Sequence, residues 1–197
     1  MTQLHRLFLA YFPRISVYWW LVVLAFVAAV FAVSWLRDTA EPRRLRAGRA
    51  ASAAAFWGYA FLLLVMLVLS RSVHTSGDVI LEPFCSWRKM LAGTRGSFEW
   101  GCLILFNALL FLPLGFFFAL DCSLRREEAQ PLGRLLLHAA ALGGCTSLLF
   151  ETLQLILRRG VFELDDILHN ALGAVLGALL WRGTEALLRC IIRRNDP

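Results

Sequence analysis

Long apolar runs separated by short, arginine-bearing segments organise this chain of 197 residues. Five runs have close to the roughly 20 residues that an α-helix needs to cross hydrocarbon; they are 15–36, 50–70, 100–120, 132–157 and 166–188. The fifth run reaches spanning length only if Arg182 and Glu185 lie at the membrane interface. The longest interval between runs, 71–99, is too short for a soluble domain. The pattern predicts an all-α polytopic membrane protein, with five transmembrane helices in one bundle and a single membrane domain over residues 1–197.

The composition agrees with this class, because 59% hydrophobic residues and a mean hydropathy of +0.64 exceed what soluble domains use. The 20 Lys and Arg residues fall in short segments at the ends of the predicted spans. Five spans place eight of them on one side and twelve on the other, with the C-terminus on the richer side. The positive-inside rule then predicts a multi-pass protein of the bacterial inner (plasma) membrane with a cytoplasmic C-terminus.

Charged and amide side chains interrupt the apolar pattern at the opposite, outer face. They are Arg71, Asn107, Glu151, Gln154, Arg158, Arg159, Asp165, Asp166, His169 and Asn170. Ionisable residues at membrane depth are costly and usually mark function. We therefore expect a polar cluster near the outer interface that forms a ligand-binding pocket.

Helical spacing places these residues in two stripes, each with steps of three or four. One stripe comprises Gly144, Ser147, Glu151, Gln154 and Arg158, and the other comprises Asp166, Asn170, Gly173 and Gly177. We expect the stripes to face each other, since the two glycines of the second stripe let helix backbones approach closely. In the third span, Pro113 frees a backbone carbonyl and Gly115 leaves room for a neighbour.

Three separated motifs carry a family resemblance. They are NALLFLPLGF at 107–116, ETLQ at 151–154 and RGVFELDDILHNALG at 159–173. In this order they resemble the VanZ-like family, over about 71–177. Glu163 stands where that family usually has an aspartate, and either Arg158 or Arg159 corresponds to its arginine. The resemblance implies a small helical bundle that lowers susceptibility to teicoplanin, a lipid-tailed glycopeptide.

The polar residues allow more than one chemistry. The cluster could serve only as interhelical glue, or an arginine could bind phosphate while Glu151 or Asp165 transfers a proton. Asp165, His169 and Glu151 could also approach a divalent ion, but the multi-histidine spacing of zinc sites is missing, so no metal and no cofactor is predicted. The five cysteines show no Cys-x-x-Cys spacing, and a disulfide between Cys85 and Cys102 is an alternative to free thiols.

The predicted partners are lipids. Basic residues in short juxtamembrane loops suit anionic headgroups, and no nucleic-acid motif is present. The leading hypothesis is a protein that binds a lipid-linked or amphiphilic envelope molecule at the outer leaflet. A membrane enzyme that transfers or hydrolyses a lipid headgroup is an alternative, although hydroxyls such as Ser147 and Thr152 usually bond their own helix. A small lipid transporter is the third possibility, and the sequence leaves the oligomeric state open.

Overall fold

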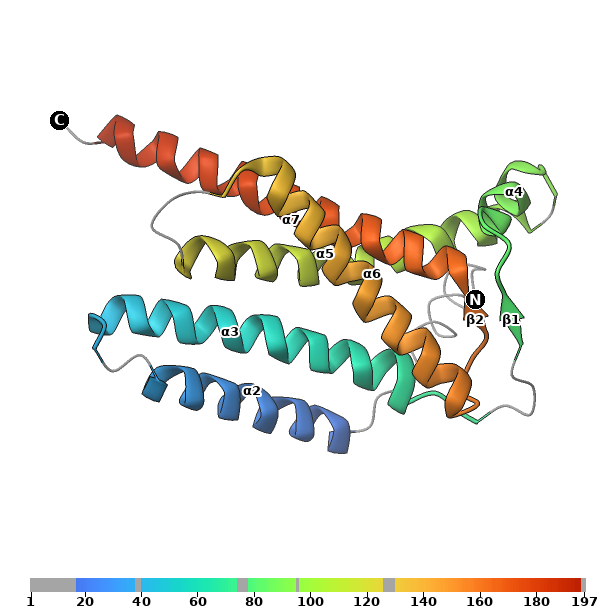
Figure 1. Ribbon diagram of the computed structural model, residues 1–197, viewed down its shortest axis with the longest axis horizontal. Helices are drawn as coiled ribbons and strands as arrows, with labels where there is room; N and C mark the ends of the chain where they lie inside the picture. The colour runs from blue at the N-terminus through green and yellow to red at the C-terminus, as the bar shows by residue number, and fades with distance from the viewer. Residues whose placement is uncertain (1–16, 38–39, 74–77, 95, 126–129, 196–197) are drawn as a thin grey trace.

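Five long apolar helices lie roughly along one axis in the computed structural model of the chain (Figure 1). The structure describes residues 17–37, 40–73, 78–94, 96–125 and 130–195. The long helices are α2 (Val17–Arg37), α3 (Arg43–Leu64), α5 (Ser97–Arg125), α6 (Leu132–Ile156) and α7 (Leu164–Asn195). Each contains a segment that is long and apolar enough to cross a membrane. The predicted all-α fold with five spanning helices is confirmed, and the chain is a multi-pass membrane protein.

The helices differ in length from the apolar runs. Residues 15 and 16 of the first run lie outside the described residues, whereas α3 begins at Arg43, seven residues before the run that starts at position 50. α5 and α7 extend beyond their runs at both ends. The extra turns are rich in Arg, which propagates helices well. Hydropathy therefore identifies the part of a helix that suits hydrocarbon, and residues with high helical propensity extend the helix beyond it.

A π-helical turn, η1 (Val65–Leu69), follows α3 directly. The Ser70 N–H donates to the Val65 carbonyl, five residues earlier, at 2.9 Å. Such turns shift the side chains that follow them around the helix and are frequent at functional sites. Here η1 immediately precedes Arg71.

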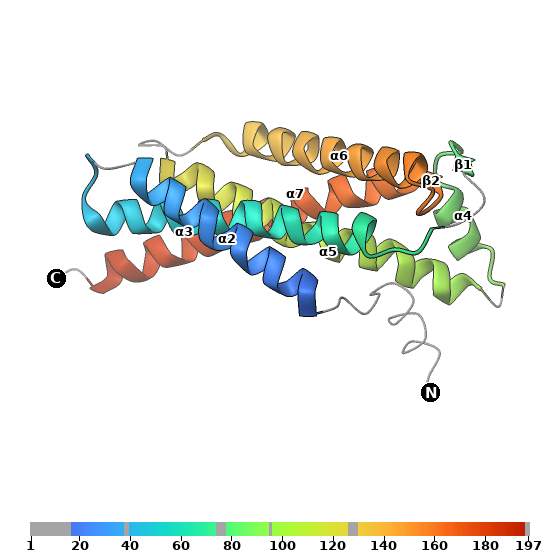
Figure 2. The same cartoon turned by 90° about the horizontal axis from the view of Figure 1, so that it is seen from below.

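Two short strands and one short helix gather at a single end of the bundle (Figures 1 and 2). β1 (Val79–Ile80) pairs in parallel with β2 (Phe162–Glu163), in the register Val79 to Phe162. α4 (Cys85–Leu91) follows β1. The ends of α3 and α6 and the starts of α5 and α7 lie at the same end of the molecule (Figure 1). This end carries most of the predicted polar residues.

Glycines bring α5 and α7 into backbone contact. A Cβ added to Gly173 would lie 2.1 Å from the Ala108 carbonyl oxygen, and one on Gly177 would lie 1.9 Å from that of Leu112. Gly115 on α5 is equally close to Ala174. The glycine seam therefore faces α5, and the prediction that these glycines face the fourth span is wrong. The reason is that one helix can present its glycines to one neighbour and its polar side chains to another.

The close approach of α6 to α7 occurs at Gly143, which precedes the stripe residue Gly144. A Cβ on Gly143 would lie 2.7 Å from the Ala174 Cβ. Pro113 lies within α5, which is one continuous helix, and Tyr59 donates its hydroxyl proton to the nearby Leu110 carbonyl at 2.8 Å. The buried core lies between α3, η1, α5 and α6 and includes Leu63, Val68, Phe111, Leu114 and Phe150. All five cysteines are free thiols, so the Cys85–Cys102 disulfide is not formed.

Candidate functional site

The ends of α6 and α7 meet through polar side chains. Ser147, Glu151 and Gln154 are all at least 96% buried along one face of α6. From α7, the Asn170 Nδ2 group donates to the Ser147 hydroxyl at 2.8 Å. The polar parts of the two predicted stripes therefore meet, even though the glycines do not share this contact.

Glu151 is buried but loosely held. Its Oε2 accepts from the Glu163 backbone N–H at 3.2 Å, and its Oε1 accepts from Gln154 Nε2 at 3.4 Å. Both distances exceed the 2.7–2.9 Å that is typical of hydrogen bonds to a charged oxygen. A carboxylate can accept about four hydrogen bonds. Most of the acceptor capacity of Glu151 is thus unused by these bonds.

Asp166 joins a third helix to the site. Its Oδ1 accepts from the Asn107 Nδ2 group on α5 at 2.5 Å. Asp166 lies within electrostatic range of Glu151. Glu151 and Asp166, on neighbouring helices, therefore influence each other electrostatically, and the hydrogen bonds given above come to each of them from neutral donors.

Asp165, the neighbouring residue, has a different role. Its Oδ1 accepts from the Phe84 N–H at 2.6 Å and its Oδ2 from the Ser86 N–H at 2.7 Å. Phe84 has φ 59° and ψ 22°, a left-handed conformation that turns these amides toward the carboxylate. Both oxygens of Asp165 are bound to backbone donors, so this residue anchors the start of α4 to α7.

His169 fixes α4 a second time. Its Nε2 accepts from the Trp87 indole N–H at 2.8 Å, which places the ring proton of the neutral imidazole on Nδ1. That Nδ1 is buried and has no partner within the described part of the chain. The sequence analysis did not identify Phe84, Ser86 or Trp87 as residues of the site. The first two act through backbone amides, and a tryptophan near a span end is normally an interfacial anchor.

The side chains of Arg158 and Arg159, which follow α6, lie in different environments. Arg158 N–H donates to the Leu155 carbonyl at 3.2 Å and Arg159 N–H to the Gln154 carbonyl at 2.7 Å, which is a Schellman motif that ends the helix. Arg158 occupies its left-handed position with φ 53°, and its side chain is exposed. Arg159 reaches inward, and its Nη1 donates at 2.6 Å to the carbonyls of Leu69 and Arg71. Arg159 therefore caps the end of η1, and Arg158 lies outside the cluster.

Arg71 is the cation that reaches the carboxylates. Its Nη1 donates to Gln154 Oε1 at 3.0 Å, and it lies within electrostatic range of Glu151, Glu163 and Asp166. Gly160 crosses over this pair, since a Cβ there would lie 2.2 Å from Gln154 Oε1. A side chain at position 160 would displace the Gln154 amide from its contact with Arg71.

We refer to Glu151, Glu163, Asp166, Asn170 and Arg71 as the acidic cluster. No salt bridge within the described residues reaches its three carboxylates. Glu163 lies outside the spanning segments, and burial raises its pKa, with Asp165 adding to the effect while Lys89 and Arg71 oppose it. The cluster therefore combines three carboxyl groups with one guanidinium.

The structure brings together nine of the ten predicted residues at this end, all except Arg158. In the described ranges, no group of three or more His, Cys, Asp and Glu side chains could hold a metal ion. Asp165 and His169, two members of the conceivable carboxylate–histidine set, are bonded to α4 instead.

Comparison with known proteins agrees with the motifs. The family model for VanZ/LLP1 matches residues 56–189, which is more than half of the chain. Neither the curated proteins nor the solved structures contain a significant match. The match extends the motif-bearing region toward both ends, from Phe56 in α3 to Arg189 in α7. The chain belongs to the VanZ/LLP1 family.

Proposed function

We propose that this VanZ/LLP1-family membrane protein binds the headgroup of a lipid or lipid-linked envelope molecule at the acidic cluster. By doing so it alters the envelope and its susceptibility to glycopeptides of the teicoplanin type. The observation that carries the proposal is Glu151, a carboxylate that is 4% exposed and whose hydrogen bonds to the described residues are two long ones. A buried charge without a strong partner is costly. Such a cost is retained where a ligand supplies the missing partner.

The surroundings of the cluster suit a ligand with an apolar tail. The segment around α4, beside the site, exposes large apolar side chains, among them Leu81, Phe84, Leu91 and Phe98, which are 58–76% exposed. Lys89 on α4 stacks over the Trp100 ring at 4.1 Å. Amphipathic segments of this kind lie in the headgroup region of a bilayer. A headgroup at the cluster would thus have its acyl chains beside apolar side chains.

The hydrogen bonds of the two nearby hydroxyl groups favour headgroup binding over headgroup hydrolysis. The Ser147 hydroxyl accepts from Asn170, and the Thr152 hydroxyl donates to its own helix at the Leu148 carbonyl, at 2.7 Å. Neither hydroxyl is bonded to Glu151, as an activated nucleophile would be. The geometry supports a binding site more directly than a nucleophile–base pair.

The test is charge removal without a change of shape. Glu151→Gln should abolish glycopeptide protection in a susceptible bacterial host while the amount of folded protein stays at the wild-type level. Glu185→Gln, an acid at the other end of the bundle, is the matched control and should keep protection. The proposal fails if Glu151→Gln protects as well as wild type. It also fails if both variants lose protection only in proportion to lost folded protein.

A further inference from the structure

We infer that the headgroup bound at the acidic cluster carries a primary ammonium, whose three N–H groups are accepted by Glu151, Asp166 and Asn170. This inference rests on the proposed function, and it names the chemistry of the ligand. The headgroup is zwitterionic, because Arg71 beside the carboxylates suits its phosphate. An aminophospholipid of the ethanolamine type has this combination of groups.

The first observation is an unused acceptor beside the carboxylates. Asn170 is 5% exposed, and its Oδ1 has no hydrogen-bond partner among the described residues, although its Nδ2 donates to Ser147. Ser147 lies one turn before Glu151 on α6, and Asn170 lies one turn after Asp166 on α7. The Asn170 amide therefore lies between the two helices, one turn deeper than the carboxylate pair. A buried acceptor without a donor destabilises the fold, and a bound donor would remove this cost.

The second observation is the kind of group that is missing. Glu151, Asp166 and Asn170 Oδ1 are acceptors, and the chain's own donors to the two carboxylates are neutral amides. Arg159 is bonded to the carbonyls that end η1, so its guanidinium is not directed at the carboxylates. Among the described residues, no ammonium or guanidinium is hydrogen-bonded to Glu151 or Asp166. An ammonium has one positive charge, three donors and no acceptor, which matches this set.

The third observation concerns the phosphate. Arg71 is partly exposed, and its hydrogen bond to a side chain among the described residues uses Nη1. A guanidinium has five N–H donors and binds phosphate in a bidentate manner. Arg71 lies within electrostatic range of Glu151 and Asp166. An ammonium at the carboxylates and a phosphate at Arg71 would form alternating charges, as a zwitterionic headgroup does.

The experiment compares lipids that differ only in the headgroup. Purified full-length protein in detergent is titrated with phosphatidylethanolamine, phosphatidylcholine and phosphatidylglycerol of identical short acyl chains, and bound lipid is counted by native mass spectrometry. Phosphatidylcholine is the matched control, since its quaternary ammonium has the same charge but no N–H. We expect phosphatidylethanolamine to bind at least about tenfold more tightly than either control, because each lost bond to a charged group is worth about that factor. Phosphoethanolamine without acyl chains should compete only weakly if the ligand is a lipid.

Two variants test the ammonium contact and the phosphate contact separately. Glu151→Gln should reduce phosphatidylethanolamine binding to the level of phosphatidylcholine, whereas Arg71→Gln should weaken all three phospholipids alike. Equal binding of the ethanolamine and choline lipids by wild-type protein would overturn the ammonium assignment and leave headgroup binding intact. An ethanolamine preference that survives Glu151→Gln would also overturn it. If none of the lipids binds, the proposed function itself fails.

Discussion

The two ends of this bundle differ in how their carboxylates are paired. At the end away from α4, Asp121 accepts from Arg125 Nε at 2.7 Å, and Glu185 is paired with Arg182 at 2.9 Å and with Arg189 at 2.8 Å. We call this the paired end. At the acidic cluster, the described carboxylates have no such salt bridge. The described carboxylates of the paired end thus have arginine partners, whereas no salt bridge within the described residues reaches those of the cluster.

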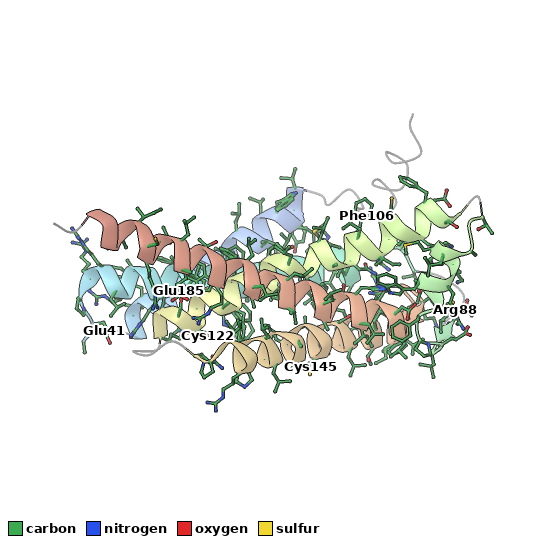
Figure 3. All side chains as sticks on the ribbon, turned by 90° about the horizontal axis from the view of Figure 1, so that it is seen from above. Glu41, Arg88, Phe106, Cys122, Cys145 and Glu185 are labelled. Carbon is green, nitrogen blue, oxygen red and sulfur yellow. The ribbon has the colours of Figure 1, made fainter. Side chains whose placement is uncertain are left out.

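Figure 3 shows this separation along the molecule, with Glu41 and Glu185 toward one end and Arg88 at the other. At the paired end, Arg49 donates to Glu41 at 3.0 Å and to the Leu124 carbonyl at 3.1 Å. Each of these acids thus has an arginine within eight positions of it along the chain. The acidic cluster differs because its charges come from separate helices. Its Arg71 contacts an amide, Gln154.

The largest effect should come from Asp165, because both of its carboxylate oxygens accept hydrogen bonds from backbone amides. Asp165→Asn removes one of the acceptors for the Phe84 and Ser86 amides, and we expect a loss of about 2–3 kcal/mol in unfolding free energy. Thermal unfolding in detergent measures the loss, and faster proteolysis within 78–94 would locate it. Glu82→Gln, which removes an exposed ion pair with Arg88 in the same segment, is the control and should leave melting unchanged. Equal melting of Asp165→Asn and wild type would show that α4 does not depend on this anchor.

Neutralising one acid at each end should change stability in opposite directions. Asp121→Asn breaks the pair with Arg125 while the Ser52 hydroxyl keeps a partner, so we expect a loss of about 0.5–1 kcal/mol that shrinks at high salt. Glu151→Gln removes a buried charge that has no salt bridge, so its melting temperature should equal or exceed that of wild type. Parallel melts of lipid-free protein in detergent measure both effects. If Glu151→Gln destabilises the bundle more than Asp121→Asn, the cluster is interhelical glue and the comparison between the ends fails.

The turn after α6 tests whether the cluster end also stores backbone strain. Arg158 is a non-glycine residue at φ 53°, and its exposed side chain is not part of the cluster. Arg158→Gly should therefore stabilise the fold by up to about 1 kcal/mol without changing lipid binding. Arg158→Ala, which removes the same side chain and keeps the strain, should give no gain in melting temperature. If both variants raised the melting temperature equally, the cause would be loss of the arginine charge and not release of backbone strain.

The sequence predicted the parts of this structure that depend on repeated, local patterns. The five spans follow from hydropathy, and the meeting of Ser147 with Asn170 follows from polar residues spaced three or four apart on two helices. The choice between Arg158 and Arg159 could not be made, because one residue at a helix end changes the side on which an arginine lies. The turn geometry that decides it is a property of the backbone.

Other parts depend on partners that are distant in the chain. Asp165 bonds to amides about 80 positions earlier, and a backbone amide has no side-chain signal in the sequence. The glycines Gly173 and Gly177 were identifiable as a packing seam, but which neighbour they contact depends on how α7 is rotated in the bundle. Spacing within one helix predicts which residues share a face, and only the packed bundle shows what that face contacts.

The smallest effect should come from Glu163, the member of the cluster in β2, outside the spans. Burial is the main cause that raises the pKa of this carboxyl above its ordinary value of 4.5. The folded state therefore binds a proton more tightly than the unfolded state, so stability falls as pH rises from the unfolded pKa through the folded pKa and stays lower above it. Glu163→Gln has no carboxyl to ionise and keeps the backbone N–H that donates to Glu151. We expect a gain of less than about 1 kcal/mol at pH 7, because the side chain keeps contact with solvent, and this gain should disappear below pH 4.5. Melting curves of both proteins between pH 4 and pH 8 measure it, and a gain of the same size at both limits would mean that packing, not ionisation, distinguishes this residue.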